Sequence, residues 1–135
     1  MHARTCIVLL LFTTLVAALA KAQHMNSPTA PCQGNLDTVQ LYDCFAAASN
    51  RADGELNGVY KQIRGILEPD DQKRLLEAQR IWLQYRDATC SAARQLYGQG
   101  TAGPPAEVAC REELTRERVA VLKTTYGWRL EKFAK

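Results

Sequence analysis

Apolar side chains recur along most of the chain at the three- and four-residue spacing of amphipathic helices. This spacing predicts helices over residues 38–67, 69–97 and 105–125, and no stretch of useful length alternates with the period of a strand. Asp37 and Gln40 have the spacing of a capping box at the start of the first helix. Because short links join the helices, neighbours should run antiparallel. The pattern therefore predicts an all-α fold, a small antiparallel three-helix bundle.

The centre of the second predicted helix, residues 77–90, combines apolar and polar chemistry. Trp82 and Tyr85, together with Ala78 and Thr89, recur at helical spacing and predict one broad apolar stripe. A tryptophan in such a stripe is more often packed in a small core than exposed as an anchor for a partner or a sugar. We therefore expect this stretch to hold the bundle together.

The first 22 residues have the pattern of a secretory signal peptide. Arg4 precedes an apolar run over residues 6–20, which is shorter than the ~20 residues that span a bilayer. Small residues at its end predict cleavage after Ala20 or Ala22, and no cysteine follows directly for a lipid anchor. We therefore expect export, to the periplasm or outside the cell. The exported chain should consist of an extended N-terminal segment, a helical domain and a basic aromatic tail: residues 23–36, 37–125 and 126–135.

Export changes the meaning of the cysteines. Four of them follow the signal peptide, and an even number in a small exported chain predicts two disulfides. Zinc is the alternative, but the chain has no C-x-x-C pair. The antiparallel register collects all four at one end of the bundle, so geometry leaves each of the three pairings open. We expect the most local pairing, which joins Cys32 to Cys44 and Cys90 to Cys110.

The charge balance excludes an electrostatic surface for nucleic acid. After the signal peptide, fifteen basic residues stand against fourteen acidic ones. His2 and His24 both lie outside the predicted domain, and no serine or unpaired cysteine lies in a nucleophile motif. Asp53 and Glu55 could in principle do acid–base work, but a solvated helix surface explains them better. We therefore expect a protein that is not an enzyme and has no metal site and no cofactor.

Polar residues of the first two helices predict a structural network. Counting outward from the turn between these helices places Asn57 near Gln79, with Tyr60 in the same network. The same count places Leu56 near Trp82. A buried amide is costly unless it is paired, so a hydrogen bond between Asn57 and Gln79 is the expected role of both.

A set of charged residues lies next to this network. By the same register Asp53 should reach Arg86, and Asp87 should approach Arg118. Partly buried ion pairs often fix the register of helices rather than add much stability. Arg86, Asp87 and Arg118 are nevertheless candidates for recognition of a partner, although a structural role is the simpler interpretation.

Two further segments could contact a partner. The link over residues 98–105 offers Gln99 and Thr101 as its polar side chains, although a segment that merely joins two helices is the simpler interpretation. Gly127 is expected to interrupt the third helix, and the basic aromatic tail that follows could touch an anionic membrane surface. Packing of this tail as an extension of the helix is the more common outcome.

The cysteines and the helix signatures follow one another in an order that matches a known family. The chain reads Ala-Gln-x-x-Trp-x-x-x-Arg-Asp-x-x-Cys over residues 78–90 and Leu-Thr-x-x-Arg-x-x-x-Leu over residues 114–122. Leu-Asn-x-x-Tyr precedes them over residues 56–60. Across residues 32–122 the chain resembles the four-cysteine LprI-like domain family of bacterial exported proteins. The resemblance implies an exported helical domain, and the name of the mycobacterial member implies inhibition of lysozyme.

Three functions follow as hypotheses. The leading one is a non-enzymatic exported binding module whose protein partner is a lysozyme, which rests on the resemblance. The second is a periplasmic envelope protein that interacts with another protein partner. The third is a membrane-surface protein that acts through the tail.

Overall fold

The computed structural model describes residues 24–133 of the chain. The predicted signal peptide, with its cleavage sites, lies outside the described residues. Within them no strand is present, and the predicted all-α class is confirmed. In chain order the elements are the 3-10 helix η1 (His24–Asn26) and the α-helices α1 (Thr38–Gly65), α2 (Pro69–Gln95) and α3 (Gly103–Phe133).

Local signals in the sequence explain where the first two helices begin. Asp37 caps α1, because its Oδ1 accepts hydrogen bonds from the backbone N–H groups of Val39 and Gln40, each at 2.9 Å. The side-chain oxygen of Gln40 accepts from the backbone N–H of Asp37 at 3.0 Å, so the predicted capping box is confirmed. Pro69 occupies the first turn of α2, where its missing N–H costs nothing.

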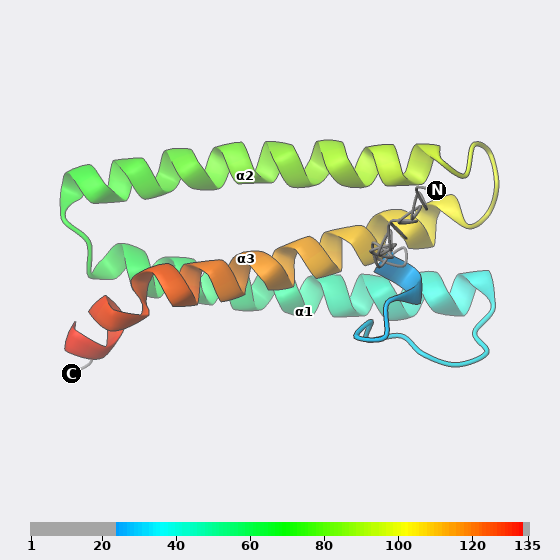
Figure 1. Ribbon diagram of the computed structural model, residues 1–135, viewed down its shortest axis with the longest axis horizontal. Helices are drawn as coiled ribbons and strands as arrows, with labels where there is room; N and C mark the ends of the chain where they lie inside the picture. Colours follow the sequence, from blue (N-terminus) through cyan, green and yellow to red (C-terminus); the bar gives the residue numbers. More distant parts are fainter. Residues whose placement is uncertain (1–23, 134–135) are drawn as a thin grey trace, which may run out of the picture.

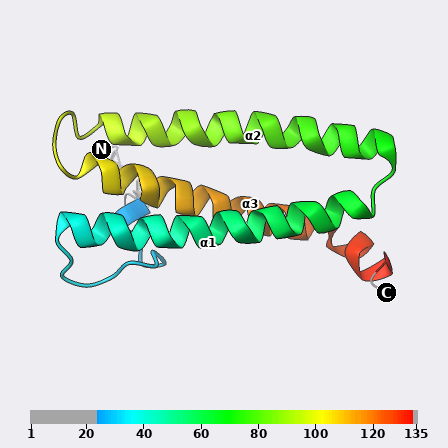
Figure 2. The ribbon, with the colours of Figure 1, turned by 180° about the vertical axis from the view of Figure 1, so that it is seen from behind.

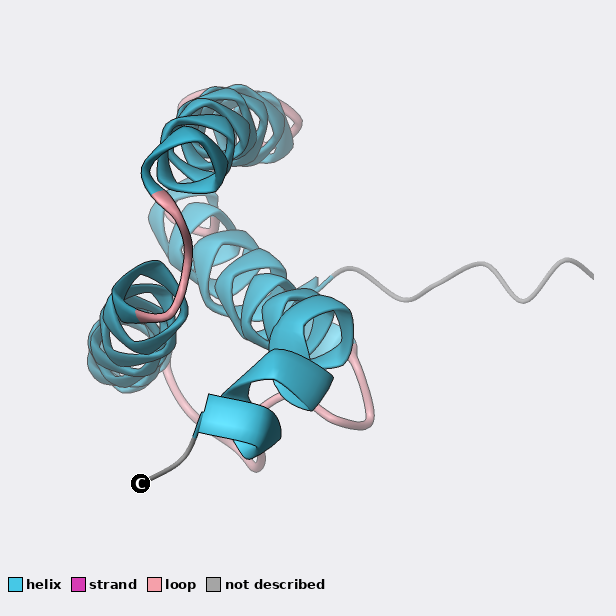
Figure 3. Cartoon of the chain, turned by 90° about the vertical axis from the view of Figure 1, so that its left-hand side faces the viewer, coloured by secondary structure: helices cyan, strands magenta, loops and turns pink. Residues whose placement is uncertain are grey.

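Helix α3 is the element on which the other two are assembled. Figure 1 shows α2 running back antiparallel to α1, and α3 running back antiparallel to α2. Both α1 and α2 pack along α3, but they hardly touch each other. Figure 2 shows the same arrangement from behind, and Figure 3 shows it end-on with α2 set apart from α1. Helix α2 is therefore attached to the molecule mainly through α3.

The largest apolar cluster lies at the end of the fold that contains the turn between α1 and α2. Four partly buried side chains pack against this cluster: Tyr60, Trp82, Tyr126 and Leu130. Burial of such side chains is the main force that holds a small helical domain together. The buried members come from all three helices and the first link: Leu56, Val59, Ile63, Leu67, Leu75, Val119 and Leu122.

Two disulfides close the opposite end. Cys32–Cys44 ties the N-terminal segment to α1, and Cys90–Cys110 ties α2 to α3. Phe45, which is fully buried, packs beside the first of them. This is the most local of the three possible pairings. Each disulfide should stabilise the domain by about 3 kcal/mol by restricting the unfolded chain.

The C-terminal tail extends the third helix and packs, as expected, but the predicted interruption at Gly127 is wrong. Helix α3 continues through Gly127 to Phe133, so the glycine does not interrupt it. The packing of Tyr126 and Leu130 against the main cluster offsets the ~1 kcal/mol that a glycine costs in a helix. The last turns do bend away from the axis of the rest of α3, as Figure 1 shows.

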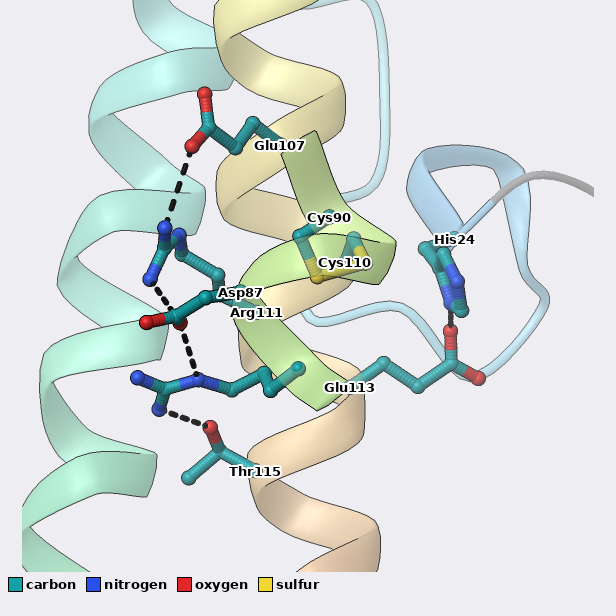
Figure 4. Close-up of a disulfide and its surroundings, with 9 residues drawn as sticks. His24, Asp87, Cys90, Glu107, Cys110, Arg111, Glu113 and Thr115 are labelled. Atoms are coloured by element: carbon teal, nitrogen blue, oxygen red, sulfur yellow. Dashed lines mark hydrogen bonds and ion pairs between the residues drawn. A yellow bond between two sulfur atoms is a disulfide. The ribbon is translucent and has the colours of Figure 1, made fainter. Parts of the chain in front are cut away.

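The N-terminal segment also differs from the prediction. His24, expected outside the folded domain, lies in η1, and its Nδ1 pairs with a carboxylate oxygen of Glu113 on α3 (Figure 4). Element η1 as a whole packs against α3. The segment that precedes α1 is therefore part of the fold and is not simply extended.

Candidate functional site

The face of α2 that turns toward the rest of the protein is unusually polar. Its buried residues are Leu75, Gln79, Arg86 and Cys90. Leu75 anchors one end of the helix in the main apolar cluster, and Cys90 fixes the other end by its disulfide. Between these two anchors an amide and a guanidinium face inward, and each needs a partner because an unpaired buried polar group is costly.

The apolar stripe predicted on this helix is wrong in part. Trp82 is half-buried and packs against the main cluster, but Tyr85 and Ala78 are exposed. The helix is rotated so that Gln79 and Arg86 take the inward positions. The helical spacing alone favoured the aromatic row, because it takes no account of polar side chains that are buried with hydrogen-bond partners on other helices.

Arg86 is the centre of the polar contact. Its side chain is only 10% exposed. Its Nη1 donates to Oδ1 of Asp53 on α1 at 2.9 Å and to Oγ1 of Thr115 on α3 at 3.1 Å. Its Nε donates to Oδ1 of Asp87 at 3.2 Å, and the guanidinium lies 5.1 Å from the ring centroid of Trp82. One side chain thus joins all three helices, and the expected pair with Asp53 is present.

A chain of ion pairs continues from this centre toward the disulfide end. Oδ1 of Asp87 also accepts from Nη1 of Arg111 at 2.8 Å. Glu107 then accepts from Arg111 at 3.3 Å and from Arg94 at 2.9 Å. Figure 4 shows Asp87, Arg111 and Glu107 of this series beside the Cys90–Cys110 disulfide. The predicted approach of Asp87 to Arg118 is therefore wrong, because Arg86 and Arg111 are the partners of Asp87.

Arg118 has a different partner. Its Nε donates to Oε1 of Gln79 at 3.2 Å, and its guanidinium lies 5.8 Å from the ring centroid of Trp82. Burial lowers the pKa of Arg118, and the interaction with Tyr126 opposes that shift. Trp82 thus lies near two guanidinium groups while its ring packs against the core, which is a structural role.

The predicted amide pair does not form. Gln79 is bonded to Arg118 and not to Asn57, and Asn57 is exposed. The hydroxyl of Tyr60 is buried and has no hydrogen-bond partner within residues 24–133. The register prediction assumed that α1 and α2 pack against each other, whereas α3 holds them apart.

This separation leaves a groove of about 350 Å³ between α1 and α2. Leu76 and Leu83, which are seven residues apart on α2, are exposed leucines on its wall. Arg80 lies between them in sequence, is exposed and makes no ion pair within the described part of the chain. The remaining lining residues are Asp53, Leu56, Asn57, Tyr60, Gln79 and Arg86. The groove can therefore bind apolar groups of a partner on its leucines and an anionic group of the same partner at Arg80.

The predicted partner-binding residues do not form one surface: some lie at the groove between α1 and α2, and others in the link between α2 and α3. Arg86 lines the groove but is bound by its own partners. Gln99 and Thr101 are exposed in the link between α2 and α3, and neither lines the groove. Sequence analysis missed Leu76, Arg80 and Leu83. The signal that could have revealed them is a second apolar row on α2, offset from the row that packs.

Within residues 24–133 no group of three or more His, Cys, Asp or Glu side chains could hold a metal ion. The same residues include no helix with the length and apolar character needed to cross a membrane.

Comparisons with known proteins identify the family. The sequence model of the family described as lysozyme inhibitor LprI matches residues 30–122. The chain therefore belongs to the LprI family. It is also 31% identical to an uncharacterized protein of Rhizobium meliloti (strain 1021) over 123 residues, which covers 82% of this chain and 88% of that protein. No solved structure matches the chain.

Proposed function

We propose that this protein is an exported, non-enzymatic binding module that inhibits a lysozyme. The observation that carries the proposal is the match of the lysozyme-inhibitor family across residues 30–122, which include most of the folded part. Export is supported by the signal-peptide pattern over residues 1–22 and by the two disulfides, which form in oxidising compartments.

A binding role suits the acidic groups near the groove better than catalysis does. Asp53 accepts a hydrogen bond from Arg86, and Glu55 pairs with Nζ of Lys123 at 2.6 Å. Both carboxylates are thus bound by cations of the protein's own fold. The carboxylates considered from the sequence therefore serve the packing of α1 against its neighbours.

The groove between α1 and α2 is the contact surface that we assign to the lysozyme. Lysozymes cleave glycosidic bonds with a pair of carboxyl groups in a cleft, so a protein that blocks such a cleft benefits from a cation that its own fold does not use. Arg80 meets this requirement, and Leu76 and Leu83 provide apolar area on the same wall. Arg86 and Arg118 are bound internally, so we assign them to the scaffold of this surface.

A lysis assay tests this function. Purified mature protein is mixed with lysozymes of several types, and the clearing of a bacterial cell suspension is followed by turbidity. We expect at least one lysozyme to be slowed. Full activity of every lysozyme at a micromolar excess of the protein would show that the proposed function is wrong.

A pair of arginine variants tests the role of the groove in the same assay. Arg80→Ala should weaken inhibition by about tenfold, the change expected when a central interface cation is truncated. Arg64→Ala is the matched control, because Arg64 is an exposed arginine in the last turn of α1 that does not line the groove. Equal inhibition by both variants would place the contact elsewhere.

A further inference from the structure

A second pocket lies between the first turns of α2 and the last turns of α3. Figure 1 shows both of these helix ends at the end of the molecule that contains the turn between α1 and α2. Its volume is about 290 Å³. Asp71 and Arg74 line it from α2, and Trp128 and Arg129 line it from α3. This pocket shares no residue with the groove, so its chemistry is independent of the proposed function.

The aromatic wall of this pocket is an exposed tryptophan. Trp128 is 61% exposed, although Tyr126 and Leu130, its neighbours on α3, pack against the core. The guanidinium of Arg129 lies 5.3 Å from the ring centroid of Trp128. An indole held in this way offers solvent a flat apolar surface beside a fixed cation.

The polar wall combines donors with one acceptor. Nη1 of Arg74 donates to Oδ1 of Asp71 at 2.7 Å, and Nη1 of Arg129 lies 3.9 Å from Oδ2 of Asp71. Nε of Arg129 is buried and has no hydrogen-bond partner within residues 24–133. A buried donor without a partner costs about 1–3 kcal/mol, and the exposed donors of this wall are the Nη atoms of the two arginines.

We propose that this pocket binds a carbohydrate that carries a carboxylate, of the sugar-acid kind found in bacterial cell-wall glycan. The C–H face of a pyranose ring is apolar and stacks on an indole, whereas its hydroxyl groups both donate and accept hydrogen bonds. Asp71 accepts from such hydroxyls, and the two arginines donate to ring or carboxylate oxygens. Two cations against one anion leave an excess positive charge that matches one carboxylate on the ligand.

A membrane surface fits the same residues less well. Lys132 lies near the ring of Phe133, 5.6 Å from its centroid, and both residues follow the pocket on α3. The pocket, however, is hollowed rather than flat. The carbohydrate uses the indole, the acceptor and both cations, so it is the occupant that we assign.

Protein-observed NMR tests the assignment with N-acetylmuramic acid as the probe. Trp82 and Trp128 are the two tryptophans of the chain, so the mature protein gives two indole N–H signals, which the conservative variant Trp128→Phe assigns. We expect a saturable shift of the Trp128 signal and no shift of the Trp82 signal. Absence of a saturable shift at Trp128 up to the solubility limit of the sugar would overturn the proposal.

Variants and control ligands decide the chemistry of the site. Arg74→Ala should weaken binding about tenfold, and Arg80→Ala, an exposed arginine of the same helix outside this pocket, should leave it unchanged. N-acetylglucosamine, which lacks the carboxylate, should bind about tenfold more weakly than N-acetylmuramic acid. Equal binding of the two sugars would overturn the proposed recognition of the carboxylate.

Two further results would contradict the carbohydrate site. One is a shift of the Trp128 signal by lactate or inorganic phosphate that is as large as the shift caused by the sugar acid. It would show that the pocket binds small anions in general. A response to vesicles of anionic phospholipid without a response to the sugar would make this surface a membrane contact.

Trp128→Ala should retain full inhibition of lysozyme, so failure of this proposal is distinguishable from failure of the proposed function.

Discussion

Replacing Arg86 by alanine removes the side chain that joins the three helices. The hydrogen bond to Thr115, whose side chain is fully buried, contributes about 1–1.5 kcal/mol. Asp53 and Asp87 are 43% and 52% exposed, so solvent screens their ion pairs with Arg86, and each contributes about 0.5 kcal/mol. The interaction with the ring of Trp82 adds about 0.5–1 kcal/mol. We therefore expect Arg86→Ala to lower the free energy of unfolding by about 3 kcal/mol.

Urea denaturation followed by circular dichroism measures this loss. Arg86→Lys should fall between the wild type and Arg86→Ala, because an ammonium keeps the charge but cannot reproduce the forked donor geometry of the guanidinium. Arg80→Ala is the matched control, since Arg80 is an exposed arginine of the same helix, and it should stay within about 0.5 kcal/mol of the wild type. A loss of less than about 1 kcal/mol for Arg86→Ala would refute the reasoning, because the buried contact to Thr115 alone should exceed it.

The other anchors of the fold give three further predictions, each measured by urea denaturation of the oxidised protein. Leu75→Ala should cost about 3 kcal/mol, because this fully buried leucine is the apolar anchor of α2, and a loss below about 1 kcal/mol would contradict that role. Asp37→Ala should lower the free energy of unfolding by about 1 kcal/mol, because α1 loses its cap. Asp37→Asn should keep most of the stability of the wild type, because asparagine also caps helices well. The double replacement Cys90→Ser and Cys110→Ser should cost about 3 kcal/mol, and unchanged stability would show that this disulfide does not restrain the unfolded chain.

Local signals made the helices and the starts of α1 and α2 predictable from the sequence. The capping box at Asp37 is read directly from neighbouring residues, and the structure shows it as expected. The second helix begins at Pro69, the position at which the sequence predicts it to begin. The end of α3 was not predictable in this way. Gly127 is a weak helix former, but the burial of Tyr126 and Leu130 outweighs its cost, and that burial depends on residues distant in sequence.

The arrangement of α1 and α2 was the part of the candidate site that sequence reasoning could not supply. A short turn joins them, so antiparallel packing between them was the natural expectation. That expectation paired Asn57 with Gln79, whereas Arg118 of α3 is the partner of Gln79. Only the three-dimensional position of α3 shows that α1 and α2 stand apart and leave a groove between them.

The exchange of one groove leucine for glutamate tests the central claim most directly. Leu83 lines the groove, whereas Ile81, another exposed aliphatic residue of α2, does not. In the lysis assay Leu83→Glu should lose most of the inhibition of lysozyme, because it places a charge in the contact surface, and Ile81→Glu should inhibit as the wild type does. Equal inhibition by the two variants would contradict the account, because it would show that the groove between α1 and α2 does not bind the lysozyme.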